Sequence, residues 1–145
     1  MISESAANGY QMVETPGVNL AAGQVTFGLW AMLRPGSASR NLFMSGQVYG
    51  TPNNHAIVLA FDPVAGTLDS SSMGSSIISA SGVYRDPSGW AFGWMQATTS
   101  YPIGNLQLMI YQPPSTYEYA GSTANGFYLW RPFLASGFVS VPDLT

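Results

Sequence analysis

The sequence contains no cysteine and no lysine, and charged residues of all kinds make up only 8% of its 145 residues. Without cysteine there is no disulfide, no thiolate nucleophile and no zinc–cysteine or iron–sulfur centre. Soluble domains usually carry roughly 25% charged residues. The surface must therefore be solvated through uncharged residues such as Ser, Thr, Asn, Gln and Gly, or be covered by neighbouring subunits. Together with the 13% aromatic content, this deficit favours an oligomer.

Positive charge is especially scarce and is spread over the chain. The arginines stand at positions 34, 40, 85 and 131, and the formal net charge is −3. Phosphate binding requires a basic patch, so we expect no nucleic-acid partner. No apolar run reaches the roughly 20 residues of a membrane span, and MISESAANGY lacks the features of a signal peptide. We expect no membrane partner and synthesis in the cytoplasm.

Apolar residues recur with a period of two in three clear segments. These are residues 25–33, 55–61 and 106–111, and Gly or Pro punctuates the chain at intervals of about 8–12 residues, as in sandwiches. No helical stripe is sustained. The pattern predicts a single all-β domain, a two-sheet antiparallel β-sandwich over residues 24–145. Residues 1–23, rich in Ser, Ala, Asn and Gly, are predicted to form an extended N-terminal arm that contacts a neighbouring subunit.

The densest pattern is GSTANGFYLWRPFLASG, residues 121–137. Asn125-Gly126 favours a positive-φ turn, and Phe127 to Trp130 suit a buried strand. Pro132 offers no backbone donor, so the strand is predicted to end near Arg131. The large buried areas of the core are predicted to include all four indoles, those of Trp30, Trp90, Trp94 and Trp130.

The order of these segments resembles a known family. The segments are VTFGLWAML, HAIVLAFD, SGWAFGWMQAT, LQLMIYQ and NGFYLWRPFLASG, within residues 24–137. The chain resembles the jelly-roll, carbohydrate-binding-module-like domains of bacteriophage tail and head appendages. Arg131-Pro132 replaces the usual Gly-Ala of the closing strand, and 134–136 lacks the acid that precedes the final glycine in the family. The resemblance implies a jelly-roll fold and a place on the virion.

The sequence offers few residues that could act in catalysis. His55, the only histidine, is interpreted as a strand-edge residue, because no partners for a Ser-His-Asp triad can be assigned. Glycoside hydrolysis needs two carboxylates about 5–10 Å apart, and most of the seven acids fall in predicted turns or tails. Asp62, Asp69 and Asp86 are interpreted as turn residues, with a loop Ca²⁺ site as the alternative. We predict no enzymatic activity and no cofactor.

The best candidate contacts are aromatic and amide side chains near the C-terminal third. Alternation places the rings of Tyr117 and Tyr119 on one side, which suits a glycan platform. The other interpretation is that these rings cover the core or a subunit contact. The candidate glycan or subunit contacts are Tyr111, Gln112, Tyr117, Glu118, Tyr119 and Arg131.

These observations predict a non-enzymatic virion structural protein. It would be a small capsid decoration, knob or fibre subunit, a homotrimer that docks on the particle with other virion proteins. The alternative is a carbohydrate-recognition module of a phage appendage that binds a host surface glycan.

Overall fold

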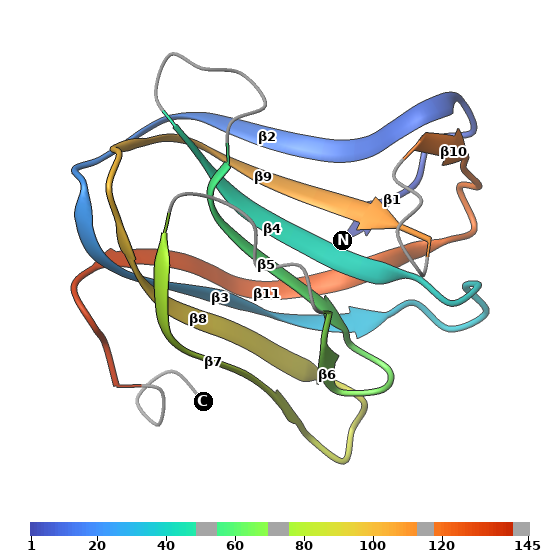
Figure 1. Cartoon of the computed structure of the whole chain (residues 1–145). Helices are drawn as coiled ribbons and strands as arrows, with labels where there is room; N and C mark the ends of the chain where they lie inside the picture. The colour runs from blue at the N-terminus through green and yellow to red at the C-terminus, as the bar shows by residue number, and fades with distance from the viewer. Residues whose placement is uncertain (49–54, 70–75, 113–117, 141–145) are drawn as a thin grey trace.

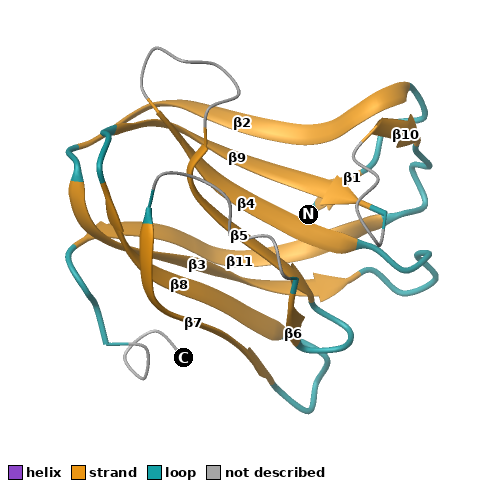
Figure 2. Cartoon of the chain, viewed as in Figure 1, coloured by secondary structure: helices purple, strands orange, loops and turns teal. Residues whose placement is uncertain are grey.

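The computed structural model describes residues 1–48, 55–69, 76–112 and 118–140, and every regular element within them is a β-strand. The strands form two antiparallel sheets that pack against each other (Figure 1, Figure 2). The predicted two-sheet antiparallel β-sandwich is therefore confirmed.

One sheet has five strands in the order β1-β11-β3-β8-β7, and the other has six in the order β10-β2-β9-β4-β5-β6. The bounds of the first sheet's strands are β1 Ile2–Ser3, β11 Gly126–Ser136, β3 Gly23–Leu33, β8 Ala91–Thr99 and β7 Ile77–Arg85. The bounds of the second are β10 Glu118–Ala120, β2 Asn8–Leu20, β9 Ile103–Tyr111, β4 Asn41–Val48, β5 His55–Asp62 and β6 Thr67–Leu68. The predicted strands over 25–33, 55–61 and 106–111 correspond to β3, β5 and β9.

The core lies between the two sheets and follows the period of two. The longer strands contribute alternate residues to it, because successive side chains point to opposite faces. The fully buried members with the largest side chains are Phe27, Phe61, Phe127, Leu29, Leu42, Met44, Ile57, Leu59, Ile103 and Ile110. Gly93 of β8 faces the ring of Phe61, and a Cβ at Gly93 would lie 2.6 Å from that ring. The absence of a side chain there allows the sheets to approach.

The N-terminal segment is not an arm, and this prediction was wrong. Ile2–Ser3 pairs with β11, and Asn8–Leu20 forms a 13-residue strand between β10 and β9. The Ser, Asn, Gly and Pro content that suggested an arm has a different cause. Most of the described β2 side chains are exposed, so this strand has little need of apolar residues.

The closing strand also continues further than predicted. β11 pairs with β3 on both sides of Arg131-Pro132, and the register shifts between Trp130 and Phe133. Arg131 takes a left-handed conformation with φ of 47°. A bulge absorbs a proline that a regular ladder would reject, and the strand runs on to Ser136. Before the strand, Asn125 donates its amide to the Ser122 carbonyl, and neither Asn125 nor Gly126 has positive φ.

Candidate functional site

The predicted tyrosine platform does not form as an exposed surface. Tyr111 and Tyr119 are both buried, and Gln112, directly after β9, is half-buried. Tyr117 lies outside the described residues. Glu118 begins β10, and the structure describes its backbone but not its side chain. The hydroxyl of Tyr111 donates to the Asp69 carboxylate. A buried ring cannot stack on a sugar from solvent, so the site has to be sought elsewhere.

Tyr119 instead belongs to a buried polar cluster around Glu4, which we call the Glu4 cluster. Tyr119 donates to Oε1 of Glu4 at 2.7 Å, Nδ2 of Asn125 to Oε2 at 2.9 Å, and the amide of Ser122 to Oε2 at 2.8 Å. Arg40 forms an ion pair with Oε1, and its guanidinium lies 5.2 Å from the centre of the Tyr119 ring. Both carboxylate oxygens are fully engaged, so the cluster joins chain segments and leaves no acceptor for a ligand.

The titration of the cluster follows from these contacts. Burial alone raises the pKa of Glu4, but hydrogen bonds from Arg40, Tyr119, Asn125 and Ser122 outweigh it, so its pKa lies below the ordinary value. Burial lowers the pKa of Arg40, whereas the hydrogen bond and charge of Glu4 raise it, with a net rise. Burial and then Glu4 raise the pKa of Tyr119. The cluster is held as carboxylate, guanidinium and neutral phenol.

The tryptophans were wrongly predicted to fill the core between the sheets. Phe27, Leu29 and Ala31 of β3 face the core, so Trp30 faces away from it, over the outside of the five-stranded sheet. The register places Trp130, Trp30, Phe92 and Tyr84 in one row across β11, β3, β8 and β7. Trp94 is on the same outer face of β8. We call this the aromatic row.

The rings of the aromatic row pack against one another through Trp30. The ring of Trp30 lies 6.2 Å from that of Trp130, 5.3 Å from Phe92 and 6.0 Å, edge-on, from Tyr84. Trp30 is only 6% exposed, whereas Trp130 is 48% and Tyr84 50% exposed. The middle of the row is thus covered by its own neighbours, and its two ends are open to solvent.

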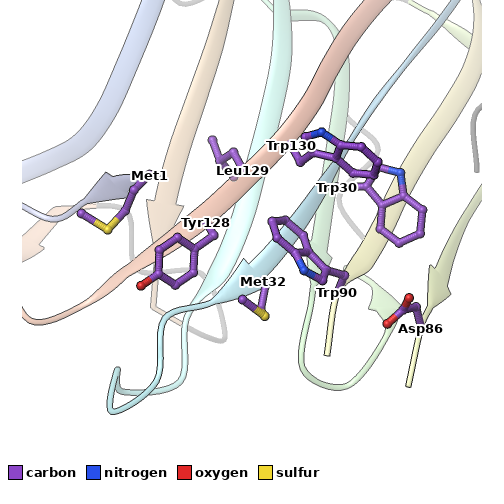
Figure 3. Close-up of a pocket in the computed structure, with 8 residues that line it drawn as sticks. All are labelled: Met1, Trp30, Met32, Asp86, Trp90, Tyr128, Leu129 and Trp130. Atoms are coloured by element: carbon purple, nitrogen blue, oxygen red, sulfur yellow. The ribbon is translucent and has the colours of Figure 1, made fainter. Parts of the chain in front are cut away.

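Beside the open Trp130 end, the sheet carries a groove with a volume of about 620 Å³, which we call the aromatic groove (Figure 3). Figure 3 shows Met1 and Tyr128 at one end of the lining and Asp86 at the other, with three indoles between. The register explains the gathering, because Tyr128 pairs with Met32, and Trp90 directly precedes the Ala91 partner of Ala31. The lining residues are Met1, Trp30, Met32, Asp86, Trp90, Tyr128, Leu129 and Trp130.

Two polar atoms in this lining lack protein partners. Nε1 of Trp30 is buried and has no hydrogen-bond partner in the described part of the chain. Oδ1 of Asp86 accepts from the amide of Ser88 at 2.6 Å and from its hydroxyl, and no described residue bonds to Oδ2. A groove with aromatic walls and a few unmet polar groups can bind an amphipathic ligand.

Arg131, a predicted contact residue, lies at the rim. Its guanidinium stands 4.5 Å from the centre of the Trp130 ring, and the side chain is exposed. Its role as a subunit contact remains a prediction. The bulge that turns Arg131 onto Trp130 was the part of its environment that the sequence pattern did not indicate.

The other candidates have structural explanations. Asp62 accepts from the amides of Val64 and Ala65 at 2.7 and 3.0 Å, as a turn residue does, and Asp86 serves the β7–β8 turn likewise. Within the described ranges, no three His, Cys, Asp or Glu side chains gather as metal ligands would. His55 begins β5, with Nδ1 3.1 Å from the Oγ of fully buried Ser45. No carboxylate among the described residues orients the imidazole, and burial lowers its pKa.

Fold and site together define a β-sandwich with an aromatic groove on one sheet face. No protein-family model matches the chain, and no curated protein matches it in sequence. In the part of the chain that the structure describes, no helix is long and apolar enough to cross a membrane.

Proposed function

We propose that this protein is a non-enzymatic structural subunit of a bacteriophage particle, a decoration, knob or fibre module that forms homotrimers and docks on the virion. The phage assignment draws on the resemblance of residues 24–137 to appendage domains. The observation that carries the assembly is the presence of two long open sheet edges in a chain with very few charges.

The first open edge is that of β2. β10 pairs with Asn8 to Tyr10 only, so β2 beyond Tyr10 pairs with no other described strand on that side. Met12 and Val13 on this edge are 46% and 52% exposed. Soluble proteins usually protect such edges with lysine, inward charges or proline. β2 has Glu14 and Pro16 for this purpose, which leaves its first half unprotected.

The second open edge is that of β7, which ends the five-stranded sheet and pairs with β8 alone among the described strands. Its sequence, IISASGVYR, has a single charge at its last residue, and Ile77 is 74% exposed. A ring of three copies needs two different contact surfaces on each subunit, because the interfaces are heterologous. The β2 edge of one copy and the β7 edge of the next are the two surfaces that such a ring would use.

Single lysines on the edges test the proposal. Light scattering of the wild type at micromolar concentration should give three times the 15.4 kDa of a monomer. Val13→Lys and Ile77→Lys should each yield monomers, because a charge on either edge opposes pairing. Val64→Lys, at a residue that is 44% exposed in the β5–β6 turn, is the control and should leave the trimer intact.

The outcomes separate the alternatives. A wild type that stays monomeric and does not bind phage particles would overturn the proposal. Loss of assembly in Val13→Lys alone would indicate a twofold β2–β2 dimer and contradict the trimer.

A further inference from the structure

The aromatic groove has the size and walls of a small-ligand site. Its volume of about 620 Å³ falls in the 300–1,000 Å³ range of known ligand pockets. Trp90, Trp130 and Tyr128 present aromatic surface from the β7–β8 turn and β11. It lies on the outer face of the five-stranded sheet, whereas the proposed subunit contacts use the edges of β2 and β7, so strand pairing leaves that face uncovered.

Its polar atoms call for a ligand with both acceptors and donors. The buried Nε1 of Trp30 is a donor with no acceptor among the described residues, and a group of this kind is costly to leave unsatisfied. Oδ2 of Asp86 is an acceptor that no described residue uses. The hydroxyl of Tyr128 can both donate and accept. A purely apolar partner would satisfy none of them.

We propose that the aromatic groove binds a neutral pyranose glycan. A pyranose has C–H faces that stack on aromatic rings, and hydroxyls that both donate and accept hydrogen bonds. Ring hydroxyls would donate to Oδ2 of Asp86 and accept from Nε1 of Trp30. Asp86 is the only charged side chain among the lining residues, and its carboxylate disfavours uronic and sialic acids and favours neutral sugars.

A small organic cation is the competing occupant, because aromatic walls with one carboxylate also attract quaternary ammonium groups. The quaternary ammonium group itself offers no acceptor to Nε1 of Trp30, and a cation of the size of choline fills only a small part of 620 Å³. The unsatisfied donor and the volume therefore favour a sugar over a cation.

Binding measurements on the intact chain test the site. Saturation-transfer NMR and calorimetry would use maltose, cellobiose, lactose and N,N′-diacetylchitobiose, with sialyllactose and choline as the excluded classes. A neutral glycan array extends the panel. We expect a neutral sugar to bind, Trp130→Ala to weaken it roughly tenfold or more, and Asp86→Asn to admit sialyllactose.

Tyr84→Ala is the matched control for Trp130→Ala. Tyr84 stands at the opposite end of the aromatic row, has nearly the same exposure and does not line the groove. It should bind sugar as the wild type does, and circular dichroism should confirm that all variants fold. The proposal is overturned if no neutral sugar binds, if choline alone binds, or if Tyr84→Ala weakens binding as much as Trp130→Ala.

Discussion

The Glu4 cluster and the aromatic groove both combine one carboxylate with aromatic rings, yet they differ in how their polar atoms are satisfied. In the Glu4 cluster, Arg40, Tyr119, Asn125 and Ser122 engage both oxygens of a carboxylate that is 1% exposed. In the groove, Oδ2 of Asp86 and Nε1 of Trp30 have no described partner. The first arrangement is complete without a ligand, and the second is not.

The difference separates a structural role from a binding role. The Glu4 cluster joins the segment after β1 to the start of β4, to β10 and to the turn before β11. Its interactions should therefore appear in the free energy of unfolding. The groove residues Trp130 and Asp86 lie at the surface, and their substitution should appear mainly in binding. Substitutions and changes of pH test this difference.

Removing the Glu4 carboxylate should have the largest effect. Glu4→Ala leaves Arg40 buried without its counter-ion and removes the acceptor of the Asn125 side chain and of the Ser122 amide, whereas the Tyr119 hydroxyl can still donate to the Ile110 carbonyl. We expect the free energy of unfolding to fall by about 3–5 kcal/mol in urea denaturation. Glu14→Ala is the matched control, because Glu14 is exposed and, among the described residues, accepts a hydrogen bond from Asn105 alone. It should change stability by less than about 0.5 kcal/mol.

Equal losses from Glu4→Ala and Glu14→Ala would show that the Glu4 cluster does not hold the fold together. A large loss in the free energy of unfolding for Asp86→Asn would show that the aromatic groove also supports the fold, and the difference between the two sites would disappear.

The pH dependence of stability should report the same cluster with a smaller amplitude. The pKa of Glu4 is lowered on folding, so its stabilisation is full above the ordinary pKa of 4.5 and is lost as pH falls through the folded-state pKa. The pKa of His55 is lowered by burial from 6.5, so protonation of the unfolded chain destabilises the fold below that pH. Melting temperatures from pH 8 to pH 3 should fall in both ranges.

Two substitutions show which residue causes the fall in melting temperature in each pH range. Glu4→Gln should flatten the fall below pH 4.5 and leave the fall below 6.5 in place, and His55→Gln should do the reverse. An unchanged acid slope in Glu4→Gln would mean that other carboxylates dominate acid unfolding.

The sequence predicted the sandwich because apolar alternation depends on local spacing, which β3, β5 and β9 preserve. It did not predict which face of β3 was inward, because Trp30 and Leu29 are both apolar and alternation cannot rank two apolar faces. Phe27, Leu29 and Ala31 pack in the core, and three of the four indoles, those of Trp30, Trp90 and Trp130, line the groove outside it. The outer position of the aromatic row is therefore a tertiary outcome.

The Glu4 cluster was missed for a different reason. Glu4 and Arg40 are 36 residues apart, and Glu4 and Asn125 are 121 apart. No motif joins them, and the acid stands in a segment whose composition resembles a tail. The one available signal was scarcity. In a chain with four arginines, each is a candidate for a specific partner, and Arg40 has one.

Arg131 at the groove rim should give the smallest effect. Its guanidinium stacks on Trp130 at the surface, so Arg131→Ala should cost about 0.5–1 kcal/mol in the free energy of unfolding. Alanine and arginine bear the same strain at φ of 47°, so their difference isolates the stacking. Arg131→Gly removes both the stacking and the strain, and should be more stable than Arg131→Ala. If Arg131→Ala instead costs as much as Glu4→Ala, the rim is part of the structural framework, and its distinction from the Glu4 cluster fails. If it dissolves the oligomer at unchanged stability, Arg131 is a subunit contact.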